Sequence, residues 1–199
     1  MNKIKILVEG ASDNNFISSF LNFLGKKEKV DFDIYDCEGK DGIVNVKENL
    51  KDNLDAANTR DCSRILIIFD ADNSIETAIN NIEKQLKDLN FFNENIRIFL
   101  LPNNKDKGNL ETLLEKIAKH QKILKCFDYY KECIENKQNA IPNLKTPNKK
   151  SKWFAYKEAF GYKNGIKKEN FDISKYIDFN ADYIKELKEF LISAFKENK

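Results

Sequence analysis

The chain contains, at residues 64–72, the stretch Arg64-Ile65-Leu66-Ile67-Ile68-Phe69-Asp70-Ala71-Asp72. Its apolar run shows no alternation and is bounded by charge, which is typical of a strand buried on both faces. Such strands belong to parallel sheets that helices cover on both sides. In these sheets ligands bind outside the carboxyl ends of the strands, which is where the two aspartates stand.

The sequence on either side of this stretch alternates between strand and helix patterns. Strands are expected at about 3–9, 30–36, 64–69 and 96–101, and helices at about 12–24, 41–56 and 74–90. Connections long enough to contain a helix imply that consecutive strands run parallel. The predicted fold class is therefore α/β, with an about four-stranded, mainly parallel sheet and helices on both faces.

Beyond residue 103 the patterns are helical, and no further strand is predicted. The expected helices lie at about 109–125, 127–137, 151–160 and 181–196, with a polar, proline-containing stretch at 136–150. We therefore expect a core of residues 1–115 and a helical C-terminal extension, 116–199, packed on that core.

Composition restricts the class of protein. With 199 residues, 41% of them hydrophobic, and a net charge of only +2, the chain suits one substantial core and shows no global field for nucleic acid or membrane. No stretch is long enough to span a bilayer or to form the core of a signal peptide. The single histidine, His120, cannot complete a zinc set with the four cysteines, Cys37, Cys62, Cys126 and Cys133, which lack Cys-x-x-Cys spacing. We therefore expect the cysteines to be reduced thiols and the protein to be cytoplasmic.

Three short acidic motifs follow predicted strands. They are Val8-Glu9-Gly10-Ala11-Ser12-Asp13, Asp70-Ala71-Asp72 and Gly108-Asn109-Leu110-Glu111. Crowded carboxylates repel one another and lose solvation, so a fold that gathers them usually needs a cation there. Oxygen ligands without histidine or cysteine indicate Mg²⁺ or Mn²⁺. The predicted metal ligands are Glu9, Asp13, Asp70, Asp72 and Glu111.

Each motif also has a simpler interpretation. Asp13 or Ser12 can be a helix N-cap, the Asp70–Asp72 pair can initiate a turn and cap the next helix, and Glu111 can interact with a helix dipole. An Asp-x-Asp motif also opens haloacid-dehalogenase phosphatases, but those place it on the first strand, whereas here it ends the third.

A lysine-rich segment, residues 145–168, interleaves basic and aromatic side chains. Lysines that screen phosphates beside rings that stack on bases make a nucleic-acid surface. The alternative is a helix with an aromatic stripe facing the core and lysines facing solvent. The candidate nucleic-acid contacts are Lys105, Lys107, Lys150, Lys152 and Trp153.

Together, Val8-Glu9-Gly10 and Phe69-Asp70-Ala71-Asp72 resemble the Toprim domain of topoisomerases, primases, small ribonucleases and OLD-type nucleases, over about residues 1–115. More narrowly, the chain resembles the small stand-alone bacterial Toprim proteins of the DUF3226 type, which are related to OLD nucleases; Gly108 to Glu111 and the tail Lys150-Ser151-Lys152-Trp153 fit that pattern. The resemblance implies a Toprim (Rossmann-like) fold and a magnesium site. The topoisomerase tyrosine domain, the primase zinc module and the OLD ATPase domain are not present in this sequence.

By this resemblance Glu9, Asp70 and Asp72 are the catalytic residues, with Glu9 as general acid/base or metal ligand and the two aspartates as metal ligands. Asp13 and Glu111 match further acids of the nuclease branch, and five carboxylates suit two ions where three suit one. The expected function is Mg²⁺-dependent phosphodiester chemistry on DNA or RNA, most simply as a nuclease. The alternative is a non-catalytic Toprim-like partner or regulatory subunit, for instance of a separately encoded ATPase. The metal hypothesis requires Glu9, Asp70 and Asp72 to converge on one ion.

Overall fold

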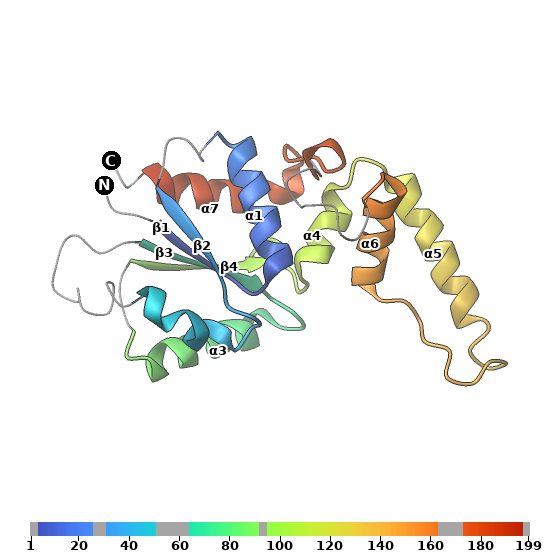
Figure 1. Ribbon diagram of the computed structural model, residues 1–199, viewed down its shortest axis with the longest axis horizontal. Helices are drawn as coiled ribbons and strands as arrows, with labels where there is room; N and C mark the ends of the chain where they lie inside the picture. Colours follow the sequence, from blue (N-terminus) through green and yellow to red (C-terminus); the bar gives the residue numbers. More distant parts are fainter. Residues whose placement is uncertain (1–3, 26–30, 51–63, 92–94, 163–172, 197–199) are drawn as a thin grey trace. The chain divides into compact units, whose positions relative to one another are not determined.

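The computed structural model describes residues 4–25, 31–50, 64–91, 95–162 and 173–196 (Figure 1). The chain forms two compact units. The first consists of residues 1–113 and 179–199, and the second of residues 114–178.

A four-stranded sheet is the centre of the first unit. It contains β1 (Ile4–Val8), β2 (Phe32–Asp36), β3 (Arg64–Asp70) and β4 (Ile96–Leu101) in the order β2-β1-β3-β4, and all neighbouring pairs are parallel. All of β1 and the middle of β3 are buried, and the burial of β3 agrees with the prediction from its unbroken apolar run. The predicted α/β class with a parallel sheet is confirmed, and the arrangement is Rossmann-like.

Helices cover both faces of this sheet, also as predicted (Figure 1). One face carries α1 (Ala11–Phe23) and α7 (Lys185–Lys196), which follows the short 3-10 helix η4 (Asp182–Ile184). The ring of Phe190 on α7 lies 5.2 Å from that of Phe99 on β4. The other face carries the 3-10 helix η1 (Gly42–Leu50) and α3 (Ile75–Asp88), whose Ile43 and Ile82 join the buried cluster around Ile67.

One predicted helix takes a different form. The pattern at 41–56 predicted an α-helix, but residues 42–50 form the 3-10 helix η1, and residues 51–56 lie outside the described part of the chain. The side chains at Ile43, Val46 and Leu50 are nevertheless buried, so the apolar pattern identified the correct face.

The second unit is helical. Helix α4 (Leu110–Ile117) leads into it, and it contains α5 (Gln121–Glu135), α6 (Lys149–Ala159) and the 3-10 helix η3 (Ile173–Lys175). The predicted helix at 109–125 is wrong, because the chain leaves the helix at Ala118–His120. There Lys119 N–H donates to the Tyr176 carbonyl at 2.9 Å, and Asp178 N–H donates to the Ile117 carbonyl at 2.7 Å. These pairings replace the helical hydrogen bonds that would have joined α4 to α5.

Among the helices in the described ranges, none combines the length and apolar character that a membrane crossing requires.

Candidate metal centre

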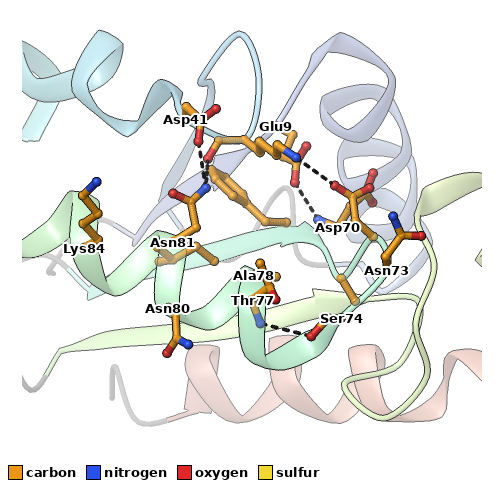
Figure 2. Close-up of a pocket in the computed structure, with 15 residues that line it drawn as sticks. Glu9, Asp41, Asp70, Asn73, Ser74, Thr77, Ala78, Asn80, Asn81 and Lys84 are labelled. Atoms are coloured by element: carbon orange, nitrogen blue, oxygen red, sulfur yellow. Dashed lines mark hydrogen bonds and ion pairs between the residues drawn. The ribbon is translucent and has the colours of Figure 1, made fainter.

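Hydrogen bonds join the three acidic motifs at the carboxyl edge of the sheet. Glu9 follows β1, and its carboxylate Oε1 accepts from the backbone N–H of Asp70 at 2.8 Å (Figure 2). The carboxylate of Asp70 in turn accepts from the backbone N–H of Leu110, the first residue of α4, at 2.9 Å. Side chains from residues 9 and 70 therefore fix the relative positions of the ends of β1 and β3 and the start of α4.

Asp72 is attached to the third motif through its backbone. It has a left-handed conformation, with φ of 50°, and forms an isolated antiparallel bridge with Gly108. Gly108 has φ of 145°, and a Cβ there would lie 2.8 Å from Thr112 Oγ1. A glycine is thus required at this position, and it holds the Asp72 loop against the N-terminal end of α4.

Asp13 and Glu111, the two further acids that the resemblance to the nuclease branch adds to the site, are buried. Asp13 lies in the first turn of α1 with 9% of its surface exposed, and Glu111 lies in the first turn of α4 with 7% exposed. The capping interpretation is wrong for the first two motifs, since Gly10 is the N-cap of α1 and Ser74 caps α3 by accepting from Thr77 N–H. For Glu111 a favourable helix-dipole interaction is compatible with its position.

The electrostatics of the site show the effect of crowding these acids. The pKa of Glu9 is raised from 4.5 to about 7, mainly because burial penalises the charged form, with added repulsion from Asp13 and Asp72. Burial likewise raises the pKa of Asp70 from 3.8 to about 8, followed by repulsion from Asp13 and Glu9. The hydrogen bonds from Asp70 N–H to Glu9 and from Leu110 N–H to Asp70 act in the opposite direction, toward the ionised forms.

A basic side chain in the loop that follows β2 lies next to the acidic side chains. Lys40, in the turn between β2 and η1, places its Nζ 3.5 Å from Asp72 Oδ2, and its charge lowers the pKa of Glu9. Hydrogen bonds from α3 hold this turn: Asn81 Nδ2 donates to Asp41 Oδ1 at 2.8 Å, and Gln85 Nε2 donates to the Lys40 carbonyl at 2.8 Å.

Sequence reasoning missed Lys40. The available signal was Gly39-Lys40-Asp41-Gly42 directly after the second strand, on the edge where the acidic motifs stand. Gly42 is required there, because a Cβ at that position would lie 1.7 Å from the carbonyl oxygen of Cys37.

The donor set fits a hard divalent cation. All its side chains offer oxygen, and the neighbouring Cys37 is buried with a pKa raised to about 12, chiefly by burial, so it stays a thiol and offers no thiolate. Within the described residues, no three His, Cys, Asp or Glu side chains lie close enough together to hold a metal ion in their present conformations. The required convergence of Glu9, Asp70 and Asp72 is therefore not preformed. Binding one ion would need these carboxylates to rotate.

A pocket of about 500 Å³ opens beside the acids (Figure 2). Glu9, Asp70 and Asp72 line one end, and the polar side of α3 lines the rest, together with Lys40 and Asp41. The pocket is open at the protein surface, so a substrate can reach the carboxylates through it.

The predicted nucleic-acid residues fall in different surroundings. In the first unit, Lys105 forms an ion pair with Glu186, and Lys107 is exposed. In the second unit, Lys150 is exposed on α6, and Lys152 Nζ lies 2.8 Å from Asp128 Oδ1 and 3.5 Å from Glu115 Oε2. Trp153 is only 7% exposed and stacks on Tyr156. A base-stacking role for Trp153 would require this packing to open, so α6 agrees better with the core-facing interpretation.

The described cysteines carry no disulfide. Cys37, Cys126 and Cys133 are free thiols, and Cys62 lies outside the described residues.

Comparison with known proteins gives one match. The model of a family described as "Protein of unknown function (DUF3226)" matches residues 3–196, nearly the whole chain. No curated protein and no solved structure matches. The resemblance to DUF3226 proteins that the acidic motifs and tail carry is thus confirmed, and this chain belongs to the DUF3226 family.

Proposed function

We propose that the carboxylate cluster at the carboxyl edge of the sheet catalyses hydrolysis of phosphodiester bonds in nucleic acid with Mg²⁺ or Mn²⁺, as a nuclease of the Toprim and OLD type. The observation that carries the proposal is the pair of hydrogen bonds from Asp70 N–H to Glu9 and from Leu110 N–H to Asp70. They unite three motifs that are separated by about 60 and 40 residues in the chain.

In this proposal Asp70 and Asp72 hold the cation, with Glu9 as a third ligand or as the proton-transferring group. Asp13 and Glu111 add the negative charge that would suit a second ion. A bound divalent cation would stabilise negative charge on the phosphate and lower the pKa of a coordinated water. The oxygen-only donor set and the accumulated negative charge support this assignment.

Glu9 has the properties of a general acid/base. In the metal-free site burial raises its pKa to about 7, and a catalytic acid or base works best when its pKa lies near the working pH. Lys40 lies at the entrance to the acids and brings a positive charge to the place where a phosphate would approach.

The test is a cleavage assay on supercoiled plasmid, single-stranded DNA and RNA, with Mg²⁺ or Mn²⁺, on the wild-type chain and Asp70→Ala. We expect cleavage by the wild type and a loss of at least about a hundredfold in the variant, the scale on which removal of one electrostatic catalytic group acts. Glu83→Gln, an exposed acid of α3 outside the pocket, is the matched control and should retain full activity. Equal activity in Asp70→Ala, or no cleavage of any substrate by the wild type, would contradict the assignment.

A further inference from the structure

Lys40 is the basic side chain that lies against the acids. Its Nζ lies 3.5 Å from Oδ2 of Asp72, one of the two aspartates that the proposed function assigns to the cation. The Lys40 ammonium and a divalent cation would both be attracted to this carboxylate, and their like charges repel each other at such short range. Lys40 is therefore a competitor of the cation for Asp72.

Hydrogen bonds fix the backbone of the turn that carries Lys40. Asn81 Nδ2 and Gln85 Nε2 on α3 donate to the Lys40 carbonyl at 3.2 and 2.8 Å. On the other side of the turn, Gly39 N–H donates to the carbonyl of Glu9 at 2.7 Å. The backbone of Lys40 is thus held beside the acids, and only its side chain can move away from Asp72.

The side chain of Lys40 is held weakly, in contrast to its backbone. The Lys40 side chain is 58% exposed and that of Asp72 is 49% exposed, and an ion pair between groups as exposed as these contributes little free energy. The flexible four-carbon stem of a lysine lets the ammonium leave one partner for another while the backbone stays in place. Exchange of Asp72 for a different anion is therefore inexpensive.

The charges around the pocket indicate which anion that would be. Two lysines face four carboxylates in its lining, namely Lys40 and Lys84 against Glu9, Asp41, Asp70 and Asp72. Lys84 lies at the end of the pocket away from Asp70 (Figure 2). A phosphate that approaches the acids would be repelled unless positive charge compensates them, and Lys40 is the lysine of the pocket lining that lies beside them.

We infer that Lys40 is an exchangeable counter-charge, which gives up Asp72 when a divalent cation binds there and then binds the phosphate of the substrate. The inference rests on the proposed function and adds an order of binding to it, with the cation first and the phosphodiester second. One side chain thereby has two opposite effects: Lys40 weakens cation binding and strengthens phosphodiester binding.

The test of the first effect measures Mn²⁺ binding without cleavage. Free Mn²⁺ is followed by its electron paramagnetic resonance signal, which is lost on binding to protein, at pH 8 and constant ionic strength. The variants are Lys40→Gln, which removes the charge, and Lys40→Arg, which keeps it. The matched control is Lys84→Gln, which removes the other lysine of the same pocket. Circular dichroism and thermal melting check that all variants are folded.

We expect Lys40→Gln to bind Mn²⁺ about fivefold to tenfold more tightly than the wild type, because it lacks the repulsion between an ammonium and a dication that share a carboxylate. Lys40→Arg should stay within about threefold of the wild type and Lys84→Gln within about twofold, since both keep a cation next to Asp72. Unchanged or weaker Mn²⁺ binding by Lys40→Gln would overturn the inference. An equal gain in Lys84→Gln would overturn it as well, because the effect would then come from the charge of the whole pocket.

The second effect is tested with dimethyl phosphate, a small phosphodiester that resists hydrolysis. The Mn²⁺ titrations are repeated with potassium dimethyl phosphate in place of KCl. In the wild type this salt should tighten Mn²⁺ binding about twofold to threefold, because two ligands that favour the same state of Lys40 strengthen each other reciprocally. The gain should disappear in Lys40→Gln. No gain in the wild type, or a gain of equal size in both proteins, would contradict the role of Lys40 in phosphodiester binding.

The inference and the proposed function fail separately. Mn²⁺ binding that tightens in Lys40→Gln, together with no cleavage of plasmid, single-stranded DNA or RNA, would support the exchange and contradict the nuclease assignment. Cleavage by the wild type, together with a Mn²⁺ affinity that is independent of Lys40, would do the reverse. A wild type that binds no Mn²⁺ would contradict both.

Discussion

The carboxylate of Glu9 accepts a hydrogen bond of 2.8 Å from the backbone N–H of Asp70, so the residue that follows β1 holds the end of β3 in place. This bond favours an ionised Glu9, whereas burial and the neighbouring acids favour the protonated form and together raise its pKa to about 7. Hydrogen bonds to the acids therefore hold the carboxyl edge of the sheet together, while the buried negative charges of the same acids destabilise it. The first three predictions follow from these two opposing effects.

Asp70→Asn should stabilise the metal-free protein at pH 8. Asparagine keeps a carbonyl oxygen for the Leu110 N–H and removes a charge that burial and Asp13 and Glu9 make unfavourable. We expect the free energy of unfolding in urea to rise by about 1–2 kcal/mol, since each pKa unit corresponds to about 1.4 kcal/mol before solvent screening. Asp72→Asn, at a half-exposed side chain, is the control and should change stability little. A destabilised Asp70→Asn would show that the charge is already compensated.

The metal-free wild type should lose stability as pH rises through neutrality. For Glu9 and Asp70 the folded pKa values of about 7 and about 8 exceed the ordinary 4.5 and 3.8. Their protonated forms therefore contribute stability that is complete below about pH 4 and disappears as pH rises through 7 to 8. Urea denaturation in EDTA at pH 6 and pH 9 measures this loss.

The control for the pH experiment is the double variant Glu9→Gln, Asp70→Asn. It lacks both titrating groups, so its stability should change less between pH 6 and pH 9. If the wild type and the double variant show the same pH dependence, other groups are responsible.

Addition of Mg²⁺ or Mn²⁺ should raise the melting temperature more at pH 8 than at pH 6. At pH 8 the acids are ionised to a greater extent and attract the cation more strongly, and a ligand that binds only the folded state stabilises it. A shift of a few degrees is expected at ligand concentrations well above the dissociation constant. Asp70→Asn should abolish most of the shift and Glu83→Gln should keep it. A shift of equal size in all three proteins would indicate non-specific binding.

Gly108→Ala should destabilise the protein by about 1–3 kcal/mol, the usual cost of a strained backbone conformation. The residue has φ of 145°, and the added Cβ would meet Thr112 Oγ1 at 2.8 Å. Because Gly108 bridges Asp72, cation-induced stabilisation should weaken as well. Thr112→Ala combined with Gly108→Ala relieves the contact but not the backbone strain, so it should recover only part of the loss. Full stability in Gly108→Ala, measured by urea denaturation, would contradict the assigned conformation.

Gln85→Glu should loosen the turn that carries Lys40. The glutamate can still accept from Ile43 N–H, as Gln85 Oε1 does at 3.0 Å, but it cannot donate to the Lys40 carbonyl. Amide hydrogen exchange over residues 38–43 should therefore accelerate, while the melting temperature changes by only a few degrees. Under the proposed function, kcat should fall several-fold.

Glu83→Gln on the same helix is the control for the turn. It should leave both exchange and activity unchanged. Unaltered exchange in Gln85→Glu would mean that Asn81 alone is sufficient to hold Lys40.

Local patterns in the sequence were enough for the strands and for the edge on which the acids stand. The apolar run before Asp70 is buried as predicted, Glu9 directly follows β1, and Asp70 is the last residue of β3. Such features are readable because burial of a strand on both faces leaves a continuous apolar run, and parallel strands end at a common edge. The same reasoning could place Lys40 on this edge, directly after the second strand, but it could not show that Asn81 and Gln85, about 40 residues away, hold the turn that carries it.

The ends of the helices likewise depend on contacts between distant segments as well as on local spacing. Apolar spacing predicted one helix through residue 120, but residues 117–119 hydrogen-bond to residues 176 and 178 and the helix ends. No local pattern reveals a partner nearly 60 residues further along the chain.

Residue order alone therefore established an α/β fold with a parallel sheet, helices on both faces and a row of carboxylates at one edge, because each of these follows from periodicity within a few residues. Contacts between distant segments established how the acidic motifs are joined, that Asp13 and Glu111 are buried, and that α3 holds the turn with Lys40 and lines a pocket beside the acids. They also established that the carboxylates of Glu9, Asp70 and Asp72 are near one another without being preformed around one ion. That last property depends on side-chain rotamers and on long-range hydrogen bonds, and spacing along the chain carries no information about either.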